Sequence, residues 1–284
     1  IGNPNVGKST LMNALVGEKL SIITSKAQTT RHRIMGIVSG EDFQIVYSGT
    51  PGILKPSYKL QESMMKFVTG ALTDADVILY VTDTVEQSER SAEIVDSIRR
   101  SGIPTVVVIN KIDLSTPEAL EALVDKWQAE IPGAQVVPTS AKENFNIEGL
   151  FRTILSLLPE GPAFYPKDTL TDKTLRFFAS EIIREKILKF YDKEIPYCCE
   201  IEIESYKEEP TIDRISATIY VARDSQKGIL IGHKGEKLKR VGQTAREDME
   251  QFLGKKVFLQ LFVKVSDDWR NNERQLRRFG YEQE

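Results

Sequence analysis

Apolar and polar positions alternate along the first half of the chain in a way that predicts strands and helices in turn. Short apolar runs between polar or glycine residues predict strands, and apolar residues three or four positions apart predict helices. This order favours an α/β class with a mostly parallel, doubly wound sheet covered by helices on both faces. The predicted strands are Ile34–Ser39, Phe43–Ser48, Val77–Asp83, Pro104–Asn110 and Gln135–Pro138, and the predicted helices are Leu11–Val16, Gln61–Leu72, Gln87–Arg100, Pro117–Ala129 and Ile147–Leu157.

The pattern changes after residues 159–166, which contain three prolines. Proline fixes φ and lacks a backbone N–H, so this stretch predicts a semi-rigid linker. The order of elements beyond it favours a smaller α+β module, with one face of a three-stranded sheet covered. We expect a first domain at 1–160, a linker at 161–172 and a second domain at 173–284. In the second domain we expect the helices Leu175–Tyr191, Glu236–Leu253 and Asp268–Phe279 and the strands Cys198–Ser205, Ile215–Arg223 and Val257–Val265.

Length and composition set limits on the class of protein. A chain of 284 residues can form two domains with cores, and no apolar run approaches the length of a membrane span. We expect a cytoplasmic protein without stable membrane insertion. The only cysteines, Cys198 and Cys199, are adjacent in a predicted strand, where a disulfide between them would be strained, so we expect them reduced. Two histidines are too few for a zinc site.

Residues 2–9, GNPNVGKS, form a G-x-x-x-x-G-K-S phosphate loop. Glycine lets such a loop turn tightly and point backbone N–H groups at phosphates, and the following helix adds its positive end. Lys8 is expected at the β- and γ-phosphates and Ser9 at Mg²⁺. Because only Ile1 precedes the loop, we expect that the strand which normally leads into it is missing. The alternative for this motif alone is a solvated glycine-rich turn. The phosphate-loop residues expected to bind GTP are Asn5, Val6, Gly7, Lys8, Ser9 and Thr10.

Two further motifs indicate that the base is guanine. Residues 110–113, NKID, follow a predicted buried strand, so they lie at its carboxyl end, where open α/β sheets bind ligands. The Asp113 carboxylate can accept both N–H groups of the guanine edge, whereas adenine would leave it unpaired. Residues 140–142, SAK, follow the next strand and are placed to contact the same base. The base-binding residues are therefore expected to be Asn110, Lys111, Asp113, Ser140, Ala141 and Lys142.

Two segments between these motifs are candidates for sensing the γ-phosphate. Residues 21–33 contain Thr29 and Thr30, and either hydroxyl can complete the Mg²⁺ shell when triphosphate binds; we favour Thr30. Residues 49–52, GTPG, follow a strand, and the backbone N–H of Gly52 is the expected γ-phosphate contact.

Taken together, GNPNVGKS, KAQTTRHRIMGI, NKID and SAK resemble the Era family of bacterial GTPases. The resemblance continues in residues 229–235, ILIGHKG, which are similar to that family's KH RNA-binding loop. It implies a P-loop GTPase domain followed by a type II KH domain. It also implies GTP hydrolysis with Mg²⁺, coupled to assembly of the small ribosomal subunit through binding near the 3′ end of 16S ribosomal RNA. Peripheral association with the inner membrane stays open, and DNA is not expected as a partner.

The sequence departs from its relatives at one position that bears on catalysis. The family has Asp-Thr-Pro-Gly where this chain has residues 49–52, so Gly49 replaces the aspartate that steadies Mg²⁺. Ile53 stands where Ras-like enzymes carry the glutamine that orients water, and the Era family is also apolar there. Related GTPases with asparagine at the Asn5 position use a K⁺ ion near the phosphates, so K⁺ is a second candidate cofactor. The expected catalytic residues are Lys8, Asn5, Thr30 and Gly52.

The GHKG loop of the second domain predicts an RNA contact. Glycine lets an RNA backbone approach closely, and residues 223–246 carry seven Lys or Arg against two acidic residues. Ile229 and Ile231 either lie under bases or fill the core, and His233 is either a phosphate donor or an exposed loop residue. Arginines of the last predicted helix are secondary candidates. The expected RNA-binding residues are Ile229, Ile231, Gly232, His233, Lys234, Gly235, Lys237, Lys239 and Arg240.

The sequence therefore predicts a GTP-binding and GTP-hydrolysing RNA-binding assembly factor. The alternative is a nucleotide-responsive RNA-binding module with little or no hydrolysis, because Gly49 lacks the carboxylate. An RNA-modifying protein is a third reading, but no nucleophile or metal cluster in the sequence favours it.

Overall fold

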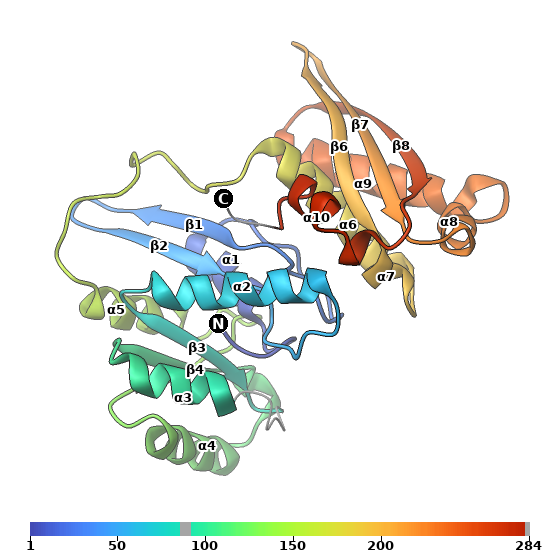
Figure 1. Cartoon of the computed structure of the whole chain (residues 1–284). Helices are drawn as coiled ribbons and strands as arrows, with labels where there is room; N and C mark the ends of the chain where they lie inside the picture. The colour runs from blue at the N-terminus through green and yellow to red at the C-terminus, as the bar shows by residue number, and fades with distance from the viewer. Residues whose placement is uncertain (86–91, 282–284) are drawn as a thin grey trace. The chain divides into compact units, whose positions relative to one another are not determined.

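The computed structural model describes residues 1–85 and 92–281 (Figure 1). Contacts between residues divide the chain into two compact units. The first contains Ile1–Ser57 and Gln61–Asp172, and the second contains Tyr58–Leu60 and the chain from Lys173 onward. The elements up to residue 172 are α1 (Lys8–Val16), β1 (Ile34–Ser39), β2 (Gln44–Gly49), α2 (Lys59–Thr73), β3 (Ile78–Asp83), α3 (Ala92–Ser101), β4 (Thr105–Asn110), η1 (Ile112–Leu114), α4 (Pro117–Glu130), β5 (Gln135–Pro138) and α5 (Ile147–Leu157).

The first unit is built on the parallel strands β3, β4 and β5, with β4 in the centre. Successive side chains of a strand point to opposite faces, and β4 shows this directly. Val106 and Val108 pack with residues of α1 and α5, whereas Val107 and Ile109 pack with residues of α2, α3 and α4. Helices therefore cover both faces of this sheet, as the alternation of elements predicts.

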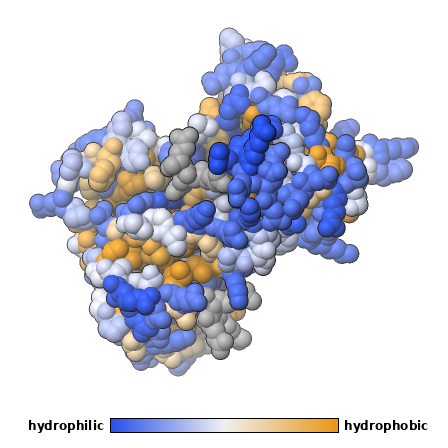
Figure 2. Space-filling view, in the orientation of Figure 1, coloured by the Kyte–Doolittle hydropathy of each residue, from blue (hydrophilic) through white to orange (hydrophobic). Residues whose placement is uncertain are grey.

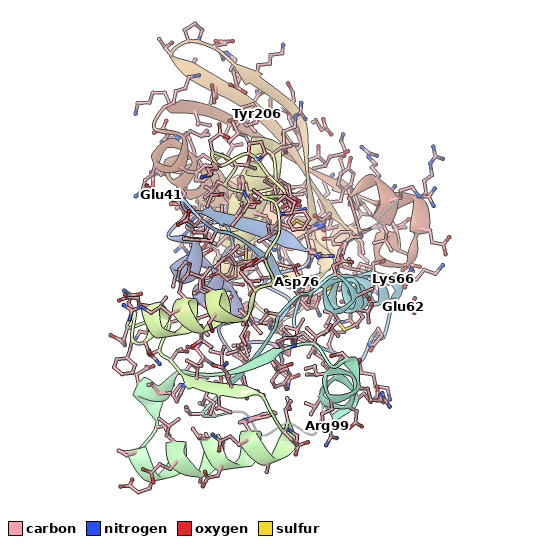
Figure 3. The ribbon with its side chains drawn as sticks, turned by 90° about the vertical axis from the view of Figure 1, so that its left-hand side faces the viewer. Glu41, Glu62, Lys66, Asp76, Arg99 and Tyr206 are labelled. Carbon is pink, nitrogen blue, oxygen red and sulfur yellow. The ribbon has the colours of Figure 1, made fainter. Side chains whose placement is uncertain are left out.

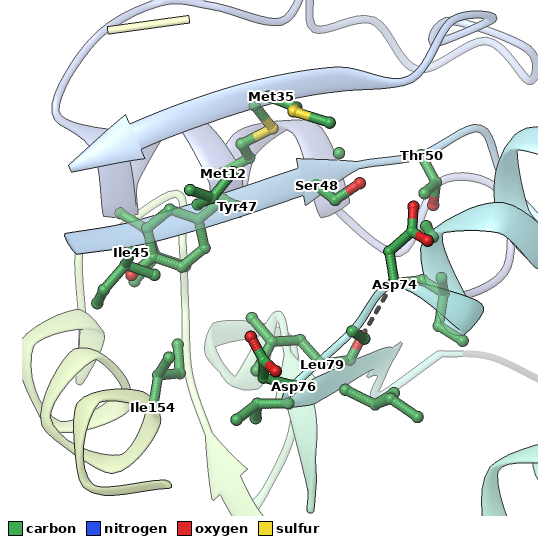
Figure 4. Close-up of a pocket in the computed structure, with 18 of the residues that line it drawn as sticks. Met12, Met35, Ile45, Tyr47, Ser48, Thr50, Asp74, Asp76, Leu79 and Ile154 are labelled. Carbon is green, nitrogen blue, oxygen red and sulfur yellow. Dashed lines mark hydrogen bonds between the residues drawn. The ribbon is translucent and has the colours of Figure 1, made fainter. Parts of the chain in front are cut away.

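Strands β1 and β2 form a separate antiparallel hairpin rather than extending the parallel sheet. A cavity of about 410 Å³ lies between β2 and β3 and is lined mainly by apolar side chains, among them Ile45, Leu79 and Ile154 (Figure 4). The Tyr47 hydroxyl is buried with no hydrogen-bond partner among the described residues, and burial raises its pKa. Figure 2 shows hydrophobic side chains among the hydrophilic ones on the surface of this unit.

Charged side chains of the covering helices point away from the core. Figure 3 shows Glu62 and Lys66 projecting from α2 and Arg99 from α3, and all three are exposed. This is the ordinary amphipathic arrangement of a helix packed on a sheet. Of the predicted helix Gln87–Arg100, residues 87–91 lie outside the described residues, and the rest falls in α3.

The proline-containing segment after α5 contacts the β1–β2 hairpin. The Gln44 side chain accepts hydrogen bonds from the backbone N–H groups of Phe164 and Tyr165, at 2.8 and 2.9 Å. Farther along, Ile37 N–H donates to Leu170 O, and Met35 N–H donates to the carboxylate of Asp172. By these contacts residues 164–172 belong with the first unit, and the predicted linker bounds stay a prediction.

The second unit contains a three-stranded sheet in the order β6–β7–β8. β6 is antiparallel to β7, whereas β7 and β8 are parallel, so the connection between them must cross the sheet. Its core joins inward side chains of β7, such as Ile215 and Ile219, to Ile183 of α6 and Val241 of α9. One sheet face is thus covered, as predicted. The elements are α6 (Leu175–Phe190), α7 (Ile195–Cys198), β6 (Glu200–Glu208), β7 (Ile212–Val221), α8 (Asp224–Ile231), η2 (His233–Gly235), α9 (Glu236–Leu253), β8 (Lys256–Val265), η3 (Trp269–Asn271) and α10 (Glu273–Arg278).

Three sequence predictions about the second unit were wrong in detail. Cys198 ends the short helix α7, and Cys199 precedes β6, so neither lies in a strand, although both are buried and reduced. The last predicted helix is broken into η3 and α10, because Asn272 between them is extended, at φ −93° and ψ 108°, and its side chain caps α10. Helix α8, directly before the GHKG loop, was missed because its apolar residues resemble a short strand.

Candidate functional site

The phosphate loop passes over the carboxyl ends of β3 and β4. A Cβ on Gly2 would overlap the carbonyl of Val81, and a Cβ on Gly7 would overlap the amide of Asn110. Gly7 also has φ 93° and precedes α1, so the loop requires glycine for its backbone angle as well as for space. These two glycines let the loop pack closely on the strand ends.

Lys8 lies over this loop. Its Nζ donates hydrogen bonds to the carbonyl oxygens of Gly2 and Asn3, at 2.9 and 2.6 Å. The ammonium is thereby held beside the first turn of α1, where the backbone N–H groups that have no helical partner also lie. A charge and several N–H groups at one point form an anion site.

The two base-binding motifs are joined to the phosphate loop through Asn110. Its Nδ2 donates to Val6 O at 2.9 Å, and its Oδ1 accepts from Ala141 N–H at 3.0 Å. The Ser140 hydroxyl donates to Asp113 Oδ1 at 2.6 Å and so orients the carboxylate predicted to read guanine. Lys142 is exposed, and a hydrogen bond to Glu143, with the charges of Glu143 and Asp113, raises its pKa.

The structure distinguishes the two candidate threonines of residues 21–33. Thr30 Oγ1 lies 2.8 Å from Ser9 Oγ. Thr29 Oγ1 instead bonds to Thr24 Oγ1 and to Lys26 O, at 2.6 and 2.5 Å. Adjacent oxygen ligands in a Mg²⁺ octahedron lie about 3.0 Å apart, given bonds of about 2.1 Å. The hydroxyls of Ser9 and Thr30 therefore fit neighbouring positions of one Mg²⁺ shell.

The GTPG segment also contacts the phosphate loop. A Cβ on Gly52 would lie 2.8 Å from Pro4 Cα, so this position approaches the loop closely. Gly49 ends β2, and a Cβ there would overlap Met12 Sδ of α1. Ile53 is buried in the core with Val68 and Ile78, so its side chain has no path to a bound water.

These segments enclose one cavity of about 560 Å³. Of the predicted nucleotide-binding residues, Val6 and Ala141 do not line this cavity. Both are buried, and the Val6 carbonyl oxygen and the Ala141 N–H form hydrogen bonds with the Asn110 side chain. Sequence reasoning missed Asp83, which ends β3 and accepts a hydrogen bond from Lys111, because no sequence motif marks it. The predicted residues that line the cavity are Asn5, Gly7, Lys8, Ser9, Thr10, Thr30, Gly52, Asn110, Lys111, Asp113, Ser140 and Lys142.

The GHKG loop of the second unit has the backbone that its glycines predict. Gly232, Lys234 and Gly235 have φ of 73°, 48° and 78°, and the loop connects α8 to α9. Leu230 is fully buried, whereas Ile229 is 43% exposed. Of the apolar residues before the loop, Leu230 therefore packs in the core, whereas Ile229 faces solvent beside the loop.

Basic residues of α9 lie over aromatic rings of the α6 end. The Arg240 guanidinium lies 4.2 Å from the centre of the Phe190 ring, and Lys237 Nζ lies 5.8 Å from that of Tyr191. His233, Lys234 and Lys239 are not buried. In α10, by contrast, Leu276 is buried and Arg278 pairs with Glu202, so this helix docks on the sheet.

The described residues show neither a helix long and apolar enough to cross a membrane nor a group of three His, Cys, Asp or Glu side chains suited to a metal.

Two family models match the chain. Residues 1–111 match the 50S ribosome-binding GTPase model, and residues 194–270 match the KH domain model.

Full-length relatives then establish the family. The chain is 45% identical over 285 residues to the GTPase Era of Alkaliphilus metalliredigens strain QYMF, with 99% of this chain and 97% of that protein covered. It is 44% identical over 283 residues to the GTPase Era of Staphylococcus haemolyticus strain JCSC1435, covering 99% and 95%. The chain belongs to the Era family of GTPases. It therefore binds and hydrolyses GTP, uses Mg²⁺, and contains an N-terminal P-loop GTPase domain and a C-terminal KH RNA-binding domain.

Two crystal structures of Era proteins match the fold with a TM-score of 0.95 and 40% identity, covering 99% of this chain and 97% of theirs. One is Era in complex with MgGDPNP and nucleotides 1506–1542 of 16S ribosomal RNA. The other is a point variant of Aquifex aeolicus Era bound to GDP·AlF4⁻.

Proposed function

We propose that this chain is a GTP-driven assembly factor of the small ribosomal subunit that binds near the 3′ end of 16S ribosomal RNA. The observation that carries the proposal is the single cavity that joins the phosphate loop, residues 22–30, Gly52 and both base-binding motifs. A related Era holds a GTP analogue and nucleotides 1506–1542 of that RNA together, which supports the same pair of ligands here.

In the nucleotide site, Lys8 and the backbone of residues 5–10 hold the β- and γ-phosphates, while Ser9 and Thr30 supply hydroxyl ligands. Mg²⁺, when bound, neutralises charge on the β- and γ-phosphate oxygens. The Gly52 N–H contacts the γ-phosphate, so residues 21–33 and the chain after Gly49 become ordered around triphosphate and relax after hydrolysis. The base is held by Asn110, Lys111, Asp113, Ser140, Ala141 and Lys142.

The catalytic power comes from charge near the phosphates rather than from a water-orienting side chain. Ile53 is buried, so Lys8, the Gly52 N–H and the metal ions must stabilise the transition state. Asn5 is a phosphate-loop residue with a left-handed backbone at φ 66°, and it lines the cavity, which supports the proposal that its amide binds K⁺. The proposed catalytic residues are Lys8, Asn5, Thr30 and Gly52.

In the KH domain the GHKG loop takes the RNA backbone, and the adjoining groove reads about four unpaired nucleotides. The left-handed glycines allow close approach, and the exposed Ile229 is free to lie under a base. The proposed RNA-binding set is Ile229, Ile231, Gly232, His233, Lys234, Gly235, Lys237, Lys239 and Arg240. We further propose a cytoplasmic location, with peripheral contact at the inner membrane. The proposed domains are 1–160 and 173–284, with a linker at 161–172 whose residues 164–172 contact the β1–β2 hairpin.

Gly49 favours a second candidate, an RNA-binding protein that responds to nucleotide but hydrolyses it slowly. No carboxylate stands at the end of β2 to steady Mg²⁺ and its waters. Single-turnover hydrolysis with Mg²⁺ separates the two candidates. The GTP-driven assembly factor must hydrolyse its bound GTP within the time of an assembly cycle, whereas the nucleotide-responsive RNA-binding protein hydrolyses it more slowly.

The proposed coupling is tested by the affinity for an RNA of nucleotides 1506–1542, measured by fluorescence anisotropy with a non-hydrolysable GTP analogue and with GDP. We expect tighter binding with the analogue, and Lys234→Glu should weaken binding in both states. Equal affinity with both nucleotides would contradict a nucleotide-driven switch.

A further inference from the structure

The end of β3 holds Lys111 through a buried carboxylate. Asp83 is 6% exposed, and its Oδ2 accepts a hydrogen bond from Lys111 Nζ at 2.6 Å. The same Nζ donates to the carbonyl oxygen of Asn5 at 2.5 Å. One ammonium group therefore joins three segments: the β3 end, the NKID motif and the phosphate loop.

The backbone of Lys111 is held at the same place. Lys111 has φ 61° and ψ 35°, a left-handed conformation that side chains other than glycine rarely adopt. The Thr84 hydroxyl donates to Lys111 O at 3.0 Å, so Asp83 and Thr84 fix both ends of this residue. Such a conformation persists only where neighbours hold it, and it is often found at ligand sites.

Asp83 also stabilises the local turn after β3, and the test must separate this role from its contact with Lys111. Its Oδ1 accepts from the backbone N–H of Val85 at 3.0 Å, which closes the turn after β3. An asparagine can keep that hydrogen bond through its amide oxygen. It would lose the negative charge that pairs with Lys111, and charge-assisted hydrogen bonds are about twice as strong as neutral ones.

We propose that Asp83 is a positioning residue for guanine nucleotides. Its carboxylate holds Lys111 against Asn5, which fixes the position of the base site relative to the phosphate loop. The proposal rests on the proposed placement of the nucleotide in the cavity of about 560 Å³. GTP and GDP share the base and the β-phosphate, so loss of this link weakens both. The γ-phosphate contacts lie elsewhere, so kcat at saturating GTP should change less than the two dissociation constants.

The test uses Asp83→Asn, Lys111→Met and the double variant of the whole chain. Dissociation constants for GTP and GDP are measured by fluorescence with labelled nucleotides, and kcat is measured at saturating GTP. Asp83→Asn should raise both constants about tenfold, the effect of one lost charge-assisted hydrogen bond. In the Lys111→Met background, Asp83→Asn should change the two dissociation constants by less than about twofold. The reason is that the effects of two substitutions that remove the same contact do not add.

Asp125→Asn is the matched control, because this exposed carboxylate of α4 lies away from the cavity. Unchanged binding in Asp83→Asn, or equal losses in the parent and Lys111→Met backgrounds, would overturn the proposal. If Asp83→Asn does not fold, Lys111→Met alone carries the test, since unchanged GTP and GDP binding in that variant overturns the proposal. A parent chain that binds no nucleotide would instead overturn the placement of the site itself.

Discussion

The thioether of Met12 occupies the space into which a Cβ on Gly49 would project. Met12 is buried in α1, and Gly49 ends β2, so the two residues meet where the helix crosses the strand end. The carbonyl oxygen of Ile34 would lie 3.3 Å from the same Cβ. The Met12 side chain therefore fits only because position 49 has no side chain, and any larger residue at position 49 must displace Met12.

Gly49→Asp is expected to destabilise the GTPase domain by about 1–3 kcal/mol, the usual cost of adding atoms to a packed site. Met12→Ala removes the overlapping sulfur, so the two substitutions together should cost less than the sum of their separate costs. Urea unfolding of the parent, both single variants and the double variant measures this coupling. Strict additivity would contradict the shared volume.

The same aspartate should improve use of Mg²⁺. In single-turnover hydrolysis, Gly49→Asp combined with Met12→Ala should reach its half-maximal rate at a lower Mg²⁺ concentration than Met12→Ala alone. The reason is that a carboxylate steadies the metal and its waters. Identical Mg²⁺ curves would mean that other groups already hold the metal.

Thr30→Val should slow hydrolysis by about tenfold or more, because it removes a hydroxyl proposed to bind the catalytic metal. Thr29→Val is the control, since the Thr29 hydroxyl bonds to Thr24 and Lys26 rather than to Ser9. Rates are measured at saturating GTP and Mg²⁺. Equal effects of the two valines would contradict the assignment of Thr30.

Replacing Na⁺ with K⁺ should speed GTP turnover by the parent chain, and Asn5→Gly should lose this response. Glycine keeps the left-handed backbone of Asn5, at φ 66°, and removes only the amide. Asn5→Ala would add backbone strain of about 1–2 kcal/mol and is the less clean variant. A parent rate that is the same in both salts would rule out the K⁺ site.

Lys234→Gly should raise stability and weaken RNA binding together. Lys234 has φ 48°, which glycine adopts without strain, so thermal unfolding should shift upward by the equivalent of about 1 kcal/mol. The lost ammonium should lower affinity for RNA and reduce its dependence on salt. Lys207→Ala is the control, because it removes the charge of an exposed β6 lysine that stands outside the proposed RNA-binding set. Unchanged RNA affinity would contradict the phosphate role of Lys234.

Alkaline pH should destabilise the KH domain, in part through Tyr191. Burial is the main cause that raises the pKa of its hydroxyl from 10.0 to about 12; Cys199 adds to the rise and Arg240 opposes it. The folded state therefore favours the protonated form, and this contribution is complete below pH 10 and lost as pH rises through 12. Denaturant unfolding between pH 9 and 12 checks the slope.

Tyr191→Phe should flatten that slope. At neutral pH it should cost about 1 kcal/mol, because the Tyr191 hydroxyl donates to Leu230 O at 2.6 Å. A variant with the parent's alkaline slope would show that another group is responsible.

The amino-acid sequence by itself determined the order of elements and the motifs of the nucleotide site. Periodicity and glycine positions act over a few residues, so β4 and the motif that follows it could be predicted from residues 104–113 alone. The place of these motifs at the carboxyl ends of parallel strands follows from the fold class. The GHKG loop was likewise identified from its glycines, which have positive φ in the structure, and its RNA contact stays a prediction.

Only the tertiary structure decided which residues meet. That Thr30 rather than Thr29 faces Ser9, and that Asp83 holds Lys111, depends on contacts between residues that are 21 and 28 positions apart. The Met12–Gly49 contact joins a helix to a strand in the same way. Such pairings arise when elements pack, and packing is set by the whole core rather than by local sequence.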